Sequence, residues 1–175
     1  MNGHEYRSLW LPERIRNFNL SHLLSSADFV TLQSYRWDFM CMWIQTMHKR
    51  PISQSELKNY SAHHLTPILT EDTLIFLHEL RNLIPAKRWG VVIAPPPIAS
   101  PHFSSHHNLM AHPSSISAAA QAARNVHSAM PDVEILDWAD ASAELAVNCI
   151  ESDGNHVRLE CAAPLLQLIA HPLQL

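Results

Sequence analysis

The sequence predicts an α/β domain built on a parallel β-sheet with helices on both of its faces. Short apolar runs of strand length alternate along the chain with longer segments that have helical spacing. This alternation is typical of right-handed βαβ units. A length of 175 residues and a hydrophobic fraction of 47% suit one compact domain with a core of its own.

The predicted strands are three short apolar runs. Residues 27–33 are apolar and β-branched, and the polar run 34–38 follows them. Residues 90–94 form the next strand, which Pro95–Pro97 must end because proline cannot donate a hydrogen bond to a sheet. Residues 133–137 form the last predicted strand, and no further strand is predicted after them.

Helices are predicted in the segments between and after these strands. Thr70 has the side chain of an N-cap, and leucines at helical spacing continue that helix to Pro85. The Ala-rich segment 114–130 predicts a second helix and residues 140–149 a short third one. A terminal helix is expected to begin at about Val157.

Charge and hydropathy exclude several classes of partner. The net charge is −4, and the 12 Lys and Arg residues are spread without a basic run, so we expect neither nucleic acid nor an anionic membrane as a partner. No apolar run approaches the roughly 18 residues of a membrane helix. Residues 1–19 are charged throughout and lack the apolar centre of a signal peptide, which predicts a cytoplasmic protein.

The cysteines and histidines do not predict a metal or a cofactor. Cys41, Cys149 and Cys161 are an odd number without the spacing of metal ligands, so we predict free, buried thiols. Four of the 13 histidines crowd one Pro- and Ser-rich loop: His102, His106, His107 and His112. Imidazoles at these spacings could bind a metal. Because a loop of this composition rarely fixes ligands, we predict solvated histidines, no metal site and no cofactor.

The polar turn 152–156 carries the most suggestive chemistry. An Asp and a His three residues apart, Asp153 and His156, can place a carboxylate against one imidazole nitrogen and leave the other free as a general base. The alternative is that Asp153 caps the last helix and His156 is an ordinary first-turn residue. Ligands on parallel sheets bind outside the carboxyl ends of the strands, where loops 34–38, 95–113 and 151–156 are expected to meet.

These features together resemble the second half of an SGNH (GDSL-type) hydrolase. The resemblance is carried by the strand that runs into Pro95–Pro97, by Asp137 at the end of the last strand, and by the Asp153-Gly154-Asn155-His156 block. Trp37 and Asp38, with Asn2-Gly3 and Tyr6-Arg7 upstream, look most similar to the PC-esterase branch. The resemblance covers about residues 27–170.

The resemblance implies a fold and a set of site residues. It implies a three-layer α/β SGNH-like domain over 1–175, with 1–26 as an irregular lead-in and 27–172 as the core. Asp153 would be the acid and His156 the base of a catalytic triad. Acylated carbohydrates or small esters are the substrate class that it suggests.

The chain departs from the family where the nucleophile should be. Its only glycines are Gly3, Gly90 and Gly154, so neither Gly-Asp-Ser nor a G-x-S-x-G elbow is present. In the family, a block after the central strand usually offers hydrogen-bond donors to the oxyanion, and in this chain residues 33–38 hold other residue types at that place. The candidates for a substrate pocket in this block are Ser34, Arg36, Trp37 and Asp38. Nothing in the sequence activates Ser34 as a substitute. We therefore expect the isolated chain to be inactive as an esterase.

Two interpretations of the missing nucleophile stay open. The chain is either an N-terminally incomplete member that lacks its first strand or strands, or a degenerate relative kept as a non-catalytic interaction module. In the incomplete member the strand at 27–33 loses one neighbour and becomes a sheet edge. Self-association through that edge is expected unless residues 1–24 cover it.

Overall fold

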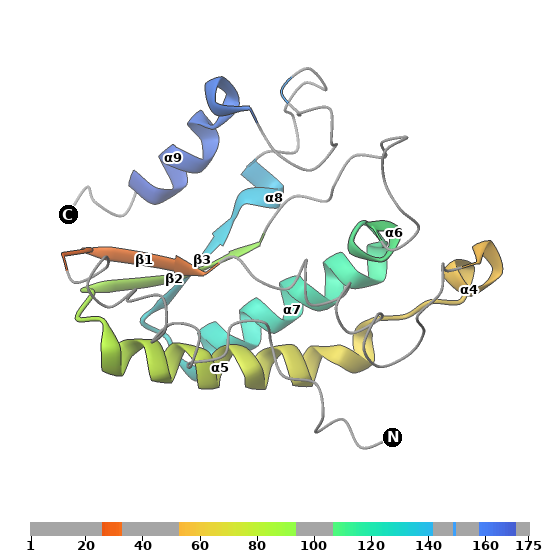
Figure 1. The fold of residues 1–175 in the computed structure, drawn as a ribbon, viewed down its shortest axis with the longest axis horizontal. Helices are drawn as coiled ribbons and strands as arrows, with labels where there is room; N and C mark the ends of the chain where they lie inside the picture. The colour runs from red at the N-terminus through yellow and green to blue at the C-terminus, as the bar shows by residue number, and fades with distance from the viewer. Residues whose placement is uncertain (1–25, 33–52, 94–106, 142–148, 150–157, 171–175) are drawn as a thin grey trace.

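The computed structural model describes residues 26–32, 53–93, 107–141, 149 and 158–170 of the chain (Figure 1). Its sheet has three strands, β1 (Phe29–Leu32), β2 (Arg88–Ile93) and β3 (Val133–Asp137), in that order. All pairs are parallel: Phe29 lies opposite Arg88, and Trp89 lies opposite Val133. The predicted α/β fold with a parallel sheet is thus confirmed for this part of the chain.

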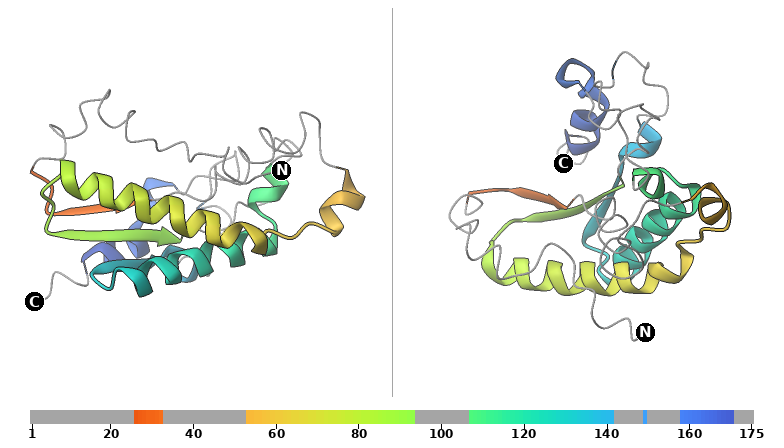
Figure 2. Two further views of the ribbon diagram at one scale, coloured as in Figure 1. Left: turned by 90° about the horizontal axis from the view of Figure 1, so that it is seen from below. Right: turned by 45° about the vertical axis from the view of Figure 1, so that its right-hand side comes forward.

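Two connections of the same kind join the strands. Between β1 and β2 lie α4 (Gln54–Lys58), the 3-10 turn η2 (His63–Leu65) and α5 (Thr66–Leu83). Between β2 and β3 lie α6 (His107–Met110) and α7 (Pro113–Ala129). Both connections step across the sheet in one direction, and right-handed crossovers then place their helices on one face. Accordingly α5 and α7 lie side by side under the sheet in Figures 1 and 2.

The chain after β3 moves to the other side of the sheet. It forms α8 (Trp138–Ala141), the 3-10 turn η4 (Leu159–Cys161) and α9 (Ala163–Ala170). In Figure 1 and in the right-hand view of Figure 2, α9 lies across the sheet from α5 and α7, and it contacts β3 and α8. Val92 and Leu136, which point to this side, are buried. No helix in the described ranges is long and apolar enough to cross a membrane.

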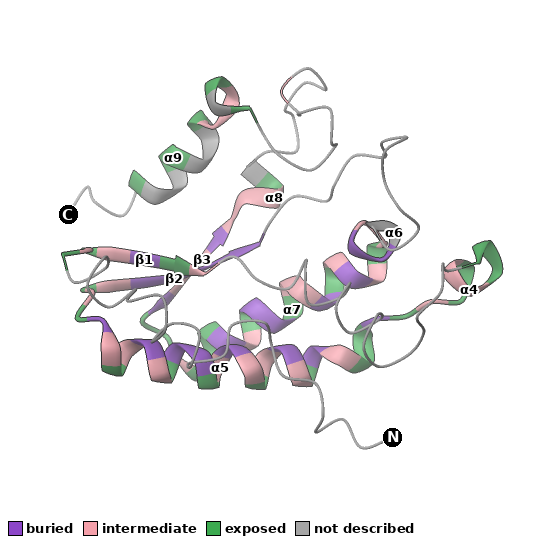
Figure 3. Ribbon diagram, viewed as in Figure 1, coloured by how far each residue is buried: buried purple, intermediate pink, exposed green. Residues whose placement is uncertain are grey.

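The main core fills the space between the sheet and the α5–α7 pair (Figure 3). Alternate residues of the strands face it, and Val30, Trp89 and Val133 are all buried. The helices contribute a set of fully or nearly fully buried side chains: Leu69, Leu77 and Leu80 from α5, and Ala118, Ala122, Ala123 and Val126 from α7. Because these α7 residues are mostly alanines, the helix can approach α5 and the sheet closely.

A polar contact ties the three strands together on the opposite face. The Arg88 guanidinium bonds to both carboxylate oxygens of Glu134, at 2.7 and 2.8 Å. It also lies 4.3 Å from the ring centroid of Phe29. The ring in turn covers Gly90, where a Cβ would come within 3.0 Å of the Phe29 Cζ atom. A glycine in the central strand therefore makes room for an aromatic side chain from β1.

Within the described ranges, β1 lies at an edge of the sheet. Among the described residues β1 pairs only with β2. Val30 is buried while Thr31 is exposed, so the strand has one covered and one more open face. Self-association through residues 27–33 stays a prediction.

The ends of several helices differ from the predicted ones. Thr70 is not an N-cap: α5 already begins at Thr66, and the Thr70 hydroxyl donates to the Thr66 carbonyl inside the helix. The terminal helix begins at Ala163 and not at Val157, because Pro164 fits only in a first turn. Helix α8 begins at Trp138, before the predicted residue 140.

Two of the described helices were not predicted: α4, and the short helix α6 inside the predicted loop 95–113. Helix α4 follows a capping box in which Glu56 N donates to Ser53 Oγ at 3.3 Å and Ser53 N donates to Glu56 Oε2 at 2.9 Å. The Ser-x-x-Glu spacing in the sequence is the signal that would have found it.

Candidate functional site

The carboxyl ends of the three strands form one edge of the sheet. Because neighbouring strands are parallel, their last residues, Leu32, Ile93 and Asp137, lie along this edge. The predicted pocket segment 34–38 starts directly after β1, and the proline-rich segment starts directly after β2. Segments 34–38 and 95–113 therefore follow neighbouring strands of the sheet in the sequence, and their meeting with residues 151–156 stays a prediction.

The predicted site residues themselves lie beyond the part of the chain that the structure describes. This holds for the catalytic candidates Asp153 and His156 and for the pocket candidates Ser34, Arg36, Trp37 and Asp38. It holds also for His102 and His106 of the histidine-rich loop. Their roles stay predictions.

Asp137 is the polar group that the structure does place at this edge. Its Oδ1 atom accepts a hydrogen bond from the backbone N–H of Asp140 at 3.0 Å. The contact caps the first turn of α8, which explains why a helix can begin directly after β3. Asp137 thus lies where the chain leaves β3 and continues through α8 toward residues 151–156 in the sequence.

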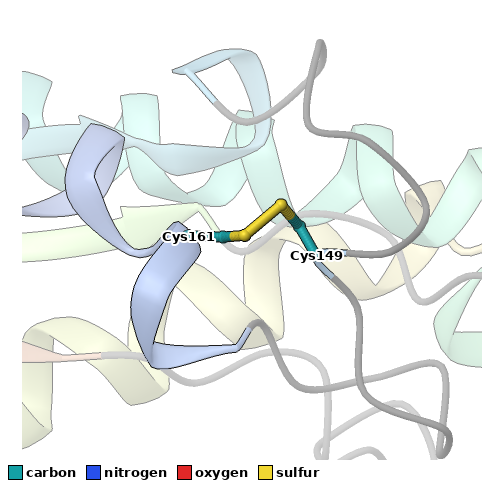
Figure 4. Close-up of a disulfide and its surroundings, with 2 residues drawn as sticks. All are labelled: Cys149 and Cys161. Carbon is teal, nitrogen blue, oxygen red and sulfur yellow. A yellow bond between two sulfur atoms is a disulfide. The ribbon is translucent and has the colours of Figure 1, made fainter.

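Cys149 and Cys161 form a disulfide (Figure 4), with their Cα atoms 5.6 Å apart. The prediction of free, buried thiols is wrong for these two residues, which are also partly exposed. Two backbone hydrogen bonds accompany the disulfide. Arg158 N donates to the Cys149 carbonyl at 2.8 Å, and Cys161 N donates to the Arg158 carbonyl at 2.9 Å. In the sequence, Asp153 and His156 lie between the bridged cysteines.

The disulfide also bears on the predicted location. Disulfides persist mainly in oxidising compartments, and in cytosolic proteins of mesophiles they are usually transient. The bond therefore argues against a constantly reducing environment. The cytoplasmic location stays a prediction.

A second polar cluster lies where α7 begins. His112 caps this helix, its Nδ1 atom accepting from Ser114 N at 3.2 Å. The Ser114 hydroxyl lies 2.8 Å from the same nitrogen and accepts a hydrogen bond from Ala62 N at 3.1 Å. Because Nδ1 accepts from a backbone N–H, the ring proton of the neutral imidazole lies on Nε2. His112 is thus half-buried and bonded, and the predicted solvated loop histidine is wrong at this position.

Tyr60 and Ser115 complete this cluster. The Tyr60 ring meets the His112 ring edge-on, with centroids 5.1 Å apart. Burial raises the pKa of Tyr60, and the hydrogen bond that its oxygen accepts from Ser115 opposes this rise. These contacts hold the start of α7 against the chain that leads into η2.

The amides beside the Ser114–His112 contact are not available to an oxyanion. An acyl-transfer site needs N–H groups that are free to bind an oxyanion. The Ser115 and Ile116 amides next to Ser114 both donate to the His112 carbonyl, at 2.9 and 3.1 Å. The cluster therefore works as a helix cap. In the described ranges no group of three or more His, Cys, Asp or Glu side chains could hold a metal ion.

Comparisons with known proteins identify no relative of this chain. No protein-family model, no curated protein and no solved structure matches this chain.

Proposed function

We propose that the chain is a domain related to the SGNH hydrolases of PC-esterase type, with Asp153 and His156 as the acid and base of an ester-cleaving site. The observation that carries the proposal is the strand order β1-β2-β3 with all strands parallel. This order supports a site at the carboxyl edge of the sheet, which is where open parallel sheets bind ligands.

The chemistry follows from the roles of the two side chains. A serine would attack the carbonyl carbon of an ester, His156 would take the hydroxyl proton, and Asp153 would hold the imidazole in the required orientation. His156 would then return the proton to the leaving alcohol. Acylated carbohydrates or small esters are the proposed substrates.

This sequence has no recognisable nucleophile for the proposed reaction. No Gly-Asp-Ser is present among the 175 residues, and Ser114 is part of a helix cap. The isolated chain is therefore proposed to be inactive as an esterase, on a three-layer α/β domain. Arg36, Trp37 and Asp38 would line the substrate pocket.

The tautomer of His156 tests this assignment. If the Asp153 carboxylate accepts a hydrogen bond from Nδ1–H, long-range ¹⁵N NMR of the neutral ring should show the proton on Nδ1 and none on Nε2. Asp153→Asn should move the proton to Nε2, because the new amide donates to Nδ1.

Controls for this test lie in the same chain. Asp140→Asn removes the exposed carboxylate of Asp140 on α8 and should leave the His156 tautomer unchanged. His112 should show the Nε2–H tautomer in every variant, because its Nδ1 accepts from Ser114. A His156 tautomer that ignores Asp153→Asn would reject the acid–base pair.

A further inference from the structure

We propose that Asn59 is an N-glycosylation site, at which an oligosaccharide is joined to the side-chain amide. Asn59-Tyr60-Ser61 has the acceptor pattern of this modification: an asparagine, then a residue other than proline, then a serine. The pattern occurs once more, at Asn19-Leu20-Ser21, which lies outside the described residues. Only the surroundings of Asn59 can therefore be compared with what a glycan requires.

The first observation is the exposure of the acceptor side chain. Asn59 and Ser61 are exposed, whereas Tyr60 between them is half-buried. The Tyr60 ring packs edge-on against the His112 ring, and its oxygen accepts a hydrogen bond from the Ser115 hydroxyl. The tyrosine thus holds the segment on the domain, while the acceptor amide and the serine of the pattern lie at the surface.

The second observation is the room around Asn59. This residue ends α4, where its backbone N–H donates to the Glu56 carbonyl at 3.2 Å. Helix α4 contains no buried residue and lies beyond the start of α5, away from the sheet (Figures 1 and 3). A glycan is bulky and belongs on the surface of a protein. At Asn59 it would displace no described residue of the core.

The side-chain amide of Asn59 has a hydrogen to give up. Its Nδ2 atom carries two hydrogens and donates to the Ser55 carbonyl at 3.2 Å. In the transfer, the bond between the anomeric carbon of a lipid-linked oligosaccharide and its pyrophosphate oxygen breaks, and that carbon forms a bond with Nδ2. The lipid pyrophosphate leaves with the electron pair of the broken bond, and one Nδ2 proton passes to a base of the transferase. One N–H remains on Nδ2.

The third observation is the Cys149–Cys161 disulfide, which is independent of the acceptor pattern. Disulfides form and persist in oxidising compartments such as the lumen of the endoplasmic reticulum, and they are rare in the cytosol. An N-glycan marks a surface segment of a secreted protein, so the two features require the same route. If Asn59 carries a glycan, the predicted cytoplasmic location is wrong.

The direct test uses the full protein, purified from the cells in which its own gene is expressed. Peptide-N-glycosidase F in H₂¹⁸O removes an N-glycan and leaves an ¹⁸O-labelled aspartate in place of the asparagine, and mass spectrometry locates this label in the peptide. We expect the label at Asn59. If the Asn59 peptide is found entirely unmodified before the treatment, the site is rejected, whatever is found at Asn19.

Two substitutions of Ser61 form a matched pair, because both keep Asn59 and its bond to the Ser55 carbonyl. Ser61→Thr satisfies the acceptor pattern and should keep the glycan, whereas Ser61→Ala should lose it completely. Circular dichroism and the intact Cys149–Cys161 bond show that each variant is folded. Equal glycan occupancy at Asn59 in the two folded variants would contradict modification through this pattern.

Discussion

Leu77→Ala is expected to lower the free energy of unfolding by about 3–5 kcal/mol, the largest effect of a single substitution that the structure predicts. Leu77 lies on α5, is fully buried, and belongs to the core between the sheet and the helix pair. Removing its side chain would leave a cavity that the sheet and α7 cannot both close. Urea unfolding followed by circular dichroism measures the change.

Ile75 provides the matched control for this prediction. It lies on the same helix, but 54% of it is exposed. Ile75→Ala should therefore change the free energy of unfolding by no more than about 0.5 kcal/mol. Equal losses for the two variants would mean that α5 does not cover the sheet with the face described above.

Ala122→Leu should destabilise the chain by about 1–3 kcal/mol for the opposite reason. Ala122 is fully buried on α7, the helix that packs against both α5 and the sheet. A leucine there would need space that close packing does not offer, so α7 would have to move outward. The same urea titration measures the loss.

The control for Ala122→Leu is Ala129→Leu, at an exposed position near the end of the same helix. It should stay within about 0.5 kcal/mol of the parent chain. A stabilising effect of Ala122→Leu would reveal unfilled space beside α7 and would contradict a close contact of this helix with the core.

The strands show how far sequence patterns determine this fold. Residues 133–137 form β3 with the predicted bounds, because the segment is apolar and a Pro-Asp turn precedes it. Strand β2 starts at Arg88, two residues before the predicted Gly90. The early start depends on partners from other strands: Arg88 is held by Glu134 and Phe29. Such contacts between distant residues cannot be read from local periodicity.

Local sequence patterns also do not predict the Cys149–Cys161 disulfide or the His112 cap. Neither cysteine lies in a recognisable motif. Their bond requires the chain to fold back so that residues 158–161 lie beside Cys149, and no sequence pattern predicts this. His112 was read as a loop residue because the Pro- and Ser-rich composition outweighed the helix that begins at Pro113. The disulfide needs a second cysteine 12 residues away, and the His112 cap needs a backbone N–H, and composition specifies neither contact.

Of the candidate site, the structure describes only the strands that precede its expected segments. The parallel order of β1, β2 and β3 supports the expectation that the segments after the strands start from one edge. The geometry of Asp153 and His156 depends on contacts between segments that lie outside the described ranges. Sequence patterns cannot specify such contacts, so the pairing must be measured.

The most direct test of the central claim is the position of the His156 ring in solution. Nuclear Overhauser effects from its Cδ2 and Cε1 protons should reach side chains at the carboxyl edge of the sheet, Leu32, Ile93 or Asp137, if His156 belongs to a site at that edge. Contacts of the His156 ring with α9 alone, and with none of these three residues, would contradict the claim and identify it as an ordinary residue before the last helix.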